Sequence, residues 1–136
     1  MRKILFLTVF ILCTIAAGQA QTIRNTSNSA IASIDDKGTV RNTSNSIIAR
    51  IDSKGIIRDS SNRMIGKIES DGRIRDKNNF CLGKIESNGT VRDCNNHTLG
   101  KVESNGTVRD SNNHMLGTAK GVPPQYAALF FFFNFF

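Results

Sequence analysis

The chain has 136 residues and a formal net charge of +7, a length that limits it to one modest domain. Its basic residues stand singly among acidic ones, which is typical of a solvated surface of mixed charge and excludes the basic blocks of a nucleic-acid-binding face. We therefore expect no nucleic-acid partner.

The first segment has the features of an export signal. Arg2 and Lys3 precede an apolar run over residues 4–15, and small residues lead up to Ala20. This order is that of a secretory signal peptide, and the apolar run is too short to remain as a membrane-spanning helix. We expect residues 1–20 to be removed and the protein to be exported. An uncleaved anchor is the alternative.

A 17-residue unit then repeats six times without insertion, and these repeats form the domain expected over residues 22–121. The period is marked by Arg24, Arg41, Arg58, Arg75, Arg92 and Arg109. Each unit holds two short strand-like runs and two turns, so every copy must occupy an equivalent structural position.

The two turns of a unit differ in the residue that reverses the chain. In the first turn this is an asparagine, a residue that tolerates the left-handed conformation. The second turn ends at a glycine, and Lys37 and Lys54 precede the first two of these glycines. Since a type I′ turn needs positive φ at both centres, which disfavours lysine, we expect a type I turn with a left-handed glycine and a G1 bulge.

Three positions of the unit stay apolar in nearly every copy and form the predicted core. In the fourth unit they are Ile74, Leu82 and Ile85. The last two are three residues apart and would face opposite sides of a regular strand. We expect a β-bulge at the small residue between them, Gly83, to bring both to one face. A helix is the rival for this spacing, but the unit leaves no room for one.

Two cysteines follow the expected cleavage site, Cys81 and Cys94. With Ile85 opposite Val91 and the bulge at Gly83–Lys84, they lie opposite each other on neighbouring antiparallel strands, within disulfide range. We expect a Cys81–Cys94 disulfide, with two free thiols as the alternative.

The C-terminal segment 122–136 is predicted to be an apolar helix. It begins with Pro123 and Pro124, and six of the nine phenylalanines lie in its last seven residues. A helix that is apolar all round is a buried one, and a ring of twelve strands needs such filling. We expect it to plug the ring and bury the phenylalanines; a peripheral membrane anchor is the alternative. The candidate core or lipid-contact residues are Tyr126, Leu129, Phe130, Phe131, Phe132, Phe133, Phe135 and Phe136.

The repeated pattern G-x-[IV]-R-D-x-x-N-x-x-[IL]-G-K-[IV]-E, followed by YAALFFFF, resembles the bacterial β-flower proteins over residues 22–136. The resemblance implies an all-β fold: a shallow, pseudo-symmetric barrel of six short hairpins around, or capped by, a C-terminal hydrophobic helix, similar to tubby-like and scramblase-like barrels. It also implies a periplasmic or envelope-associated protein. The first two units depart from the pattern, with Asn25 and Asn42 for Asp, and Ala32 and Ala49 for Gly.

No residue pattern indicates catalysis. His97 and His114 occupy the same position in neighbouring units, but no thiolate or carboxylate cluster accompanies them, which favours surface turn residues over a metal site. Catalytic triads and nucleotide-binding motifs are missing. We expect a non-enzymatic binding or scaffolding module of the cell envelope, without metal or cofactor, in contact with membrane lipid or an envelope protein. The alternative is a surface-display repeat protein that binds glycan or a protein partner.

Overall fold

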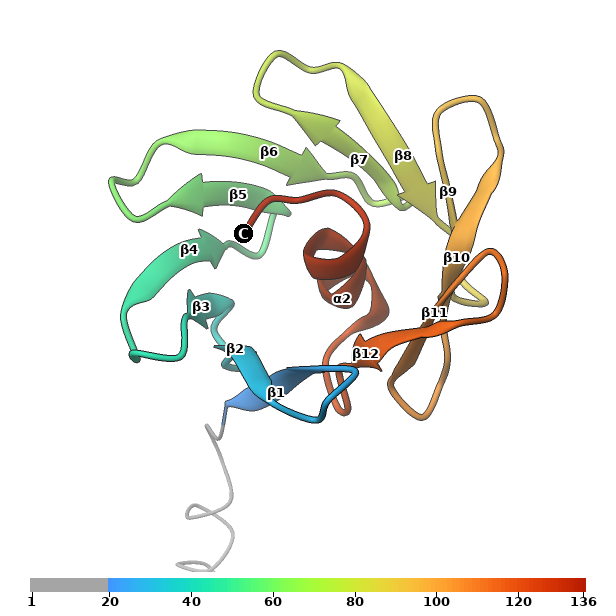
Figure 1. The fold of residues 1–136 in the computed structure, drawn as a ribbon. Coiled ribbons are helices and arrows are strands. Elements are labelled where there is room, and N and C mark those ends of the chain that lie inside the picture. Colours follow the sequence, from blue (N-terminus) through green and yellow to red (C-terminus); the bar gives the residue numbers. More distant parts are fainter. Residues whose placement is uncertain (1–19) are drawn as a thin grey trace, which may run out of the picture.

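The computed structural model describes residues 20–136; apart from Ala20, the expected signal peptide lies outside them. Twelve antiparallel strands form one closed barrel in which each strand pairs with its neighbours in sequence and the last strand pairs with the first (Figure 1). The strands are β1 (Gln21–Asn25), β2 (Ala30–Ile34), β3 (Thr39–Arg41), β4 (Ile47–Ile51), β5 (Ile56–Asp59), β6 (Met64–Ile68), β7 (Arg73–Asp76), β8 (Cys81–Ile85), β9 (Thr90–Arg92), β10 (Thr98–Val102), β11 (Thr107–Asp110) and β12 (Met115–Thr118). The predicted all-β fold class is confirmed, with six hairpins (β1–β2 to β11–β12) around the helix α2 (Pro124–Phe131).

An asparagine turn forms the outer tip of each hairpin, and the hairpins radiate from the centre (Figure 1). In the fourth hairpin, Asn79 has φ of 68° and donates its N–H to the carbonyl of Asp76 at 3.0 Å. A side chain at the first turn position caps the tip, since Asp76 Oδ1 accepts the N–H groups of Asn78 and Phe80. The same left-handed conformation recurs at Asn28, Asn45, Asn62, Asn96 and Asn113.

Glycine turns join each hairpin to the next. Gly89 has φ of 92° and donates to the carbonyl of Glu86 at 2.9 Å. Asn88, directly before it, is not among the residues with positive φ in the described part of the chain. Only the glycine is left-handed, so the predicted type I turn with a G1 bulge is confirmed.

The register agrees with the prediction at the glycine turn and differs from it at the bulge. Ile85 pairs with Val91, as predicted. The predicted bulge at Gly83–Lys84 is wrong, because the register shifts toward β7 instead, where Leu82 has no partner. Gly83 therefore faces the interior beside Ile85, and both are buried. A glycine at this position leaves space inside the barrel, and it does not itself form the bulge.

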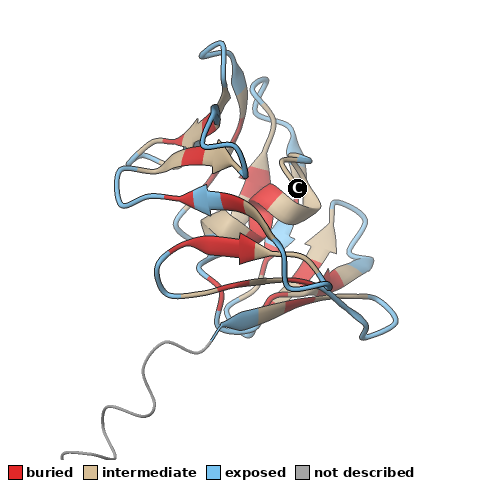
Figure 2. Cartoon of the chain, turned by 90° about the vertical axis from the view of Figure 1, so that its left-hand side faces the viewer, coloured by how far each residue is buried: buried red, intermediate tan, exposed pale blue. Residues whose placement is uncertain are grey.

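Two apolar positions of each unit and the helix make up the core (Figure 2). In the fourth hairpin Ile74 is fully buried and Ile85 is 6% exposed. From the helix, Ala127, Ala128 and Leu129 are fully buried. The remaining apolar position, occupied by Leu82 in this hairpin, was expected in the core but is only half-buried, because it lies at the bulge.

Candidate functional site

The helix determines which end of the barrel receives the phenylalanines. It lies in the middle of the ring (Figure 1). Its first residues, Pro124 and Gln125, line a recess together with the glycine-turn residues Glu69 and Glu86. Its last residue, Phe131, lies against β12 on the side of the asparagine tips. We call this side the aromatic end and define it by Phe130, Phe131, Phe132, Phe133, Phe135 and Phe136.

Four of these rings each lie against one glycine of the barrel wall. The pairs are Phe131 with Gly117, Phe132 with Gly100, Phe133 with Gly83 and Phe135 with Gly66. A Cβ built on Gly83, Gly100 or Gly117 would stand 2.6–2.8 Å from a ring carbon, closer than real Cβ contacts come. The tail therefore winds around the interior from the sixth hairpin back to the third, with one ring for each hairpin.

The other two rings of the aromatic end pack on each other. The centroids of Phe130 and Phe136 are 4.6 Å apart, with their planes inclined by 42°. Such a tilted pair is a favourable arrangement for aromatic rings. In the first two hairpins the position of the glycine is taken by Ala32 and Ala49, which are both buried.

The tail fills the core only with its helix. Leu129 is fully buried, but all six rings of the aromatic end and Tyr126 are half-buried. The expectation that the tail would plug the ring and bury the phenylalanines is met in part. The rings pack against the core, but each stays partly exposed, because the helix ends at Phe131 and the last residues run along the mouth of the barrel. Within residues 20–136, no helix has the length and apolar character needed to cross a membrane.

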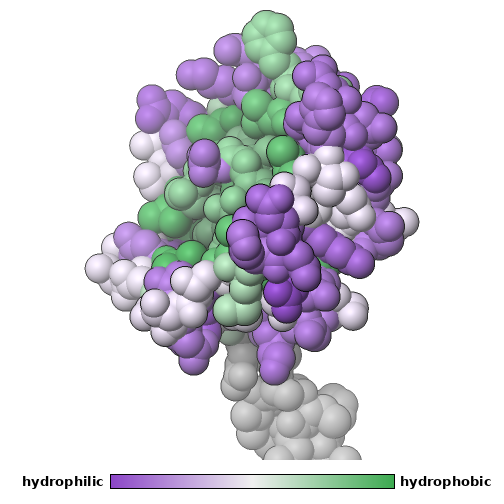
Figure 3. All heavy atoms as spheres, turned by 45° about the vertical axis from the view of Figure 1, so that its right-hand side comes forward, coloured by the Kyte–Doolittle hydropathy of each residue, from purple (hydrophilic) through white to green (hydrophobic). Residues whose placement is uncertain are grey.

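Further apolar side chains extend the aromatic end outward. Ile31 is 39% exposed, Met64 and Met115 are each 40% exposed, and Phe80 is 68% exposed. Figure 3 shows apolar residues as a continuous area between hydrophilic ones. A contiguous apolar area of this kind is a candidate binding surface. The exposure of Met64, Met115 and Phe80 was not predicted, although one signal was present: Thr98 stands at the position of the two methionines, and Ser46 at that of Phe80.

Formal charge differs between the hairpin tips with their leading arginines and the glycine turns. The segments from each repeated arginine through its tip turn hold eight basic residues (Arg24, Arg41, Arg58, Arg63, Arg75, Lys77, Arg92 and Arg109) and four acidic ones (Asp59, Asp76, Asp93 and Asp110). The glycine turns and the equivalent turn at residues 120–121 hold three basic residues (Lys37, Lys54 and Lys120) and seven acidic ones (Asp35, Asp36, Asp52, Glu69, Asp71, Glu86 and Glu103). The excess of positive charge comes from the six arginines on the strands that lead into the tips, whereas the glycine turns are negative.

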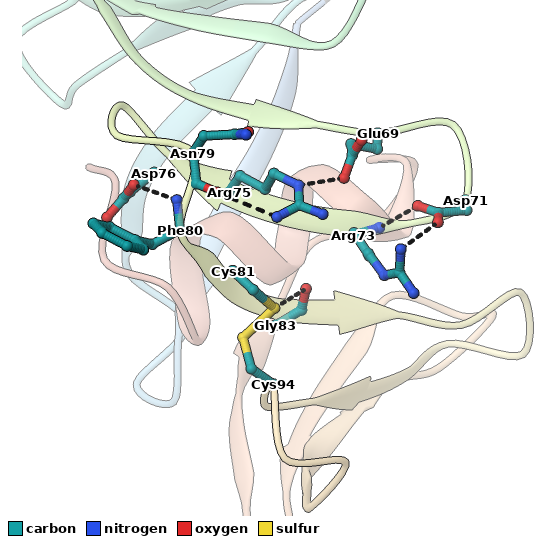
Figure 4. Close-up of polar contacts among 10 residues, drawn as sticks. All are labelled: Glu69, Asp71, Arg73, Arg75, Asp76, Asn79, Phe80, Cys81, Gly83 and Cys94. Atoms are coloured by element: carbon teal, nitrogen blue, oxygen red, sulfur yellow. Dashed lines mark hydrogen bonds and ion pairs between the residues drawn. A yellow bond between two sulfur atoms is a disulfide. The ribbon is translucent and has the colours of Figure 1, made fainter.

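The repeated arginine braces each tip. In all six hairpins its Nη1 donates to the carbonyl of the left-handed asparagine, at distances from 3.0 to 3.4 Å. In the last three hairpins Nε also donates to a glutamate. The distances are 2.9 Å for Arg92 to Glu86 and 3.0 Å for Arg109 to Glu103, and Figure 4 shows the equivalent pair of the fourth hairpin. Within the described residues, the arginines of the first three hairpins have no such ion pair.

The sequence of the glycine turn decides whether a glutamate is free to pair. In the first two turns, DDKG and DSKG, the first residue caps the turn: Asp35 accepts the N–H groups of Lys37 and Thr39, and Asp52 does the same in the next turn. In the later turns, ESDG and ESNG, the residue before the glycine accepts an N–H instead, as Asp71 does from Arg73 (Figure 4). The leading glutamate is thereby released to bind the arginine.

The two histidines belong to their own tip turns. The Nδ1 atom of His97 lies 3.1 Å from the carboxylate of Asp93, and that of His114 lies 3.5 Å from Asp110. The backbone N–H of each histidine, which donates to the same aspartate, lowers the pKa of Asp93 and Asp110 from 3.8. In the described part of the chain, no group of three His, Cys, Asp or Glu side chains is placed to hold a metal ion.

A disulfide joins Cys81 and Cys94, as the sequence predicted, with their Cα atoms 6.0 Å apart (Figure 4). Cys94 lies just beyond β9, in the tip turn of the fifth hairpin. The bond therefore ties this tip to β8 of the fourth hairpin. Arg73 and Lys84 line a shallow recess beside it.

Comparison with known proteins shows the family of this chain. No curated protein and no solved structure matches the chain. A family model described as "5-fold beta-flower protein" matches residues 20–135. That description names a fivefold arrangement, whereas this chain closes six hairpins into its barrel. The match extends over nearly all of the described residues, and the chain belongs to the 5-fold beta-flower protein family.

Proposed function

We propose that this chain is a non-enzymatic module of the bacterial cell envelope whose aromatic end contacts an anionic membrane surface. One observation carries the proposal: six partly exposed phenylalanine rings gather at the end of the barrel where the strands that lead into the tips each carry a repeated arginine. Aromatic side chains favour the membrane interface, and nearby cations are attracted to anionic lipid. The signal peptide expected at residues 1–20 would bring the protein to the envelope.

The exposed apolar side chains allow an estimate of the free energy of the membrane contact. Phe80 is 68% exposed, and Met64 and Met115 are 40% exposed. Burying about 200 Å² from these three side chains would contribute at most about 5 kcal/mol, using about 25 cal/mol for each Å². The half-exposed rings of the aromatic end add to this. Shallow insertion is therefore enough for reversible binding, and no spanning segment is needed.

Charge favours a membrane over a second copy of this chain as the occupant of the aromatic end. A head-to-head dimer would bring together two rings of six strand arginines, one from each copy. Like charges that face each other across an interface weaken association. An anionic bilayer has the opposite charge and also offers the apolar region that the phenylalanines need.

The test is co-sedimentation of residues 21–136 with vesicles of phosphatidylcholine, alone or mixed with phosphatidylglycerol, at low salt. The variant M64T/F80S/M115T removes the exposed apolar side chains, and each new residue occurs at the same position in another hairpin, as Thr98 and Ser46 do. The matched control is I56T, which has the residue found at Thr39.

The wild-type protein and I56T should bind the mixed vesicles, and the triple variant should bind at least about tenfold more weakly, a loss of about 1.4 kcal/mol. Failure of the wild-type protein to bind anionic vesicles contradicts the proposal. Equal binding by the triple variant also contradicts it, because the contact would then not involve the aromatic end.

A further inference from the structure

We infer that the barrel meets the bilayer tilted, through its first three hairpins, and that Arg24, Arg41 and Arg58 bind phospholipid phosphates there. This inference rests on the proposed function and adds an orientation to it. The six repeats look equivalent in sequence, but their charge pairing divides them into two halves. The hairpins β1–β2, β3–β4 and β5–β6 are called the first half below, and the other three the second half.

The arginines of the second half are already paired. Arg75, Arg92 and Arg109 each donate Nε to the glutamate that leads the preceding glycine turn. A cation that is held by a carboxylate attracts an external phosphate only weakly, because the local charge is neutralised.

The arginines of the first half lack this partner. Asp35 and Asp52, which stand where the glutamates would be, accept two backbone N–H groups each inside their own turns. For the first hairpin the equivalent residue is Lys120, a second cation. Among the described residues, Arg24, Arg41 and Arg58 use Nη1 for the tip carbonyl and form no ion pair. The remaining donors of each guanidinium are available in the planar geometry that suits phosphate.

These three arginines form one patch on the outer wall. They lie on β1, β3 and β5, each separated from the next by a single strand of the closed barrel. With strands about 4.8 Å apart, neighbouring arginines are about 10 Å from each other along the wall. A flat array of anionic headgroups can engage all three at once, which a single small anion cannot.

Exposed apolar side chains near the tips lie on both halves, Ile31 and Met64 on the first and Phe80 and Met115 on the second. The first half carries Ile31, Ile47 and Met64 beside its tips, whereas in the fifth hairpin the residue in the position of Met64 is Thr98. The fifth hairpin lies across the ring from the second (Figure 1). Phe80 and Met115, on the hairpins that flank the first half, extend the apolar edge on either side. Tilting toward the second hairpin brings the free arginines and these side chains to the membrane together.

A single tryptophan reports the tilt. The chain has no tryptophan of its own. Ser46 in the second hairpin and His97 in the fifth occupy the position of Phe80, which shows that this position accepts an exposed aromatic ring. The variants S46W and H97W are each bound to phosphatidylglycerol vesicles that contain brominated phosphatidylcholine, and quenching of tryptophan emission is measured. S46W should be strongly quenched and H97W nearly unquenched.

Equal quenching of both tryptophans would overturn the tilt and leave the proposed function standing, because the ring would then lie flat on the bilayer. Stronger quenching of H97W would also overturn the tilt. Absence of vesicle binding by the wild-type protein would instead contradict the proposed function itself. The three outcomes are therefore separable.

Charge removal gives a second, independent measurement. The variants R24Q/R41Q/R58Q and R75Q/R92Q/R109Q lose the same formal charge and the same tip braces. At physiological ionic strength charges act over only about 8 Å, so local contacts dominate. Each basic residue near an anionic bilayer strengthens binding by about fivefold, so the first variant should bind at least about tenfold more weakly than wild type. The second should stay within about threefold of wild type, since the tilt holds its arginines farther from the bilayer than about 8 Å. Equal losses would overturn the inference.

Discussion

The pairing of one phenylalanine ring with one glycine makes a quantitative prediction about Gly100→Ala. A Cβ at Gly100 would lie 2.6 Å from a ring carbon of Phe132. Overpacking of this kind costs about 1–3 kcal/mol. Replacing glycine by alanine in a strand returns about 0.5–1 kcal/mol of backbone entropy. We therefore expect G100A to lower the free energy of unfolding by about 0.5–2 kcal/mol.

A double-mutant cycle separates the ring contact from other effects of the new methyl. In the background of F132A the ring is gone, so G100A should cost about 1–3 kcal/mol less than in the wild-type background, and this difference is the coupling energy. The carbonyl of Arg109 also lies near a Cβ at Gly100. However, Ala32 and Ala49 occupy the same position in the first two hairpins and are buried, so the barrel wall accommodates a methyl there.

The assay is urea denaturation of the four proteins, followed by circular dichroism. If the two substitutions add within about 0.5 kcal/mol, the ring does not press on the glycine and the assignment of one ring to each hairpin is wrong. A49G is the reverse control. It removes a methyl where the wall already accommodates one, and we expect it to cost about 1 kcal/mol.

Three further predictions concern the tips. Reducing the Cys81–Cys94 disulfide, whose cysteines are 13 residues apart, should lower the free energy of unfolding by about 3 kcal/mol and raise the intact mass by two hydrogens; an unchanged mass would show free thiols. Because hydrogen bonds depress the folded-state pKa of Asp93 and Asp110 from 3.8, their stabilisation is complete above about pH 4 and is lost as the pH falls through the lower folded values. In D93N/D110N the free energy of unfolding should fall less steeply at acid pH than in the wild-type protein. An equally steep fall would show that these two carboxylates are not its source. N96A should cost about 1 kcal/mol because Asn96 has φ of 71°, whereas N96G should cost little; equal losses would contradict the backbone argument.

Local chemistry explains why the sequence predicted the hairpins well. Each turn contains its own determinant, a left-handed asparagine such as Asn79 or a left-handed glycine such as Gly89. The period of 17 residues then places every unit in an equivalent position. Lysine before the first glycines was enough to favour the type I turn, and the structure confirms it.

The role of the glycine at the small position was predicted wrongly, because two different structural requirements both favour glycine. A glycine inside a strand can mark a bulge or the close approach of another group. Local sequence favoured the bulge, whereas in the structure the carbonyl of Arg92 and the ring of Phe133, which comes from the far end of the chain, both lie against Gly83. The tail has no 17-residue period, so nothing in the repeats indicated which ring each glycine would meet.

The sequence also did not predict that the phenylalanines would stay partly exposed. The composition of the tail predicted that the phenylalanines would be buried. In the structure the buried face of the helix consists of Ala127, Ala128 and Leu129, and the helix ends at Phe131. Only the length of the helix relative to the short barrel decides this. The division of the arginines, in contrast, could have been predicted from the change from D-x-K-G to E-S-[DN]-G, because only a turn capped at its third residue leaves the glutamate free.

The tail is at once the core of the barrel and, in the proposed function, the source of its contact face. The most direct test compares residues 21–136 with a chain that ends at Gly121, using circular dichroism and vesicle co-sedimentation on both. We expect the shorter chain to lose its cooperative fold, because it lacks the fully buried Ala127, Ala128 and Leu129. A shorter chain that stays folded and merely stops binding vesicles would contradict it, because the tail would then be an anchor alone.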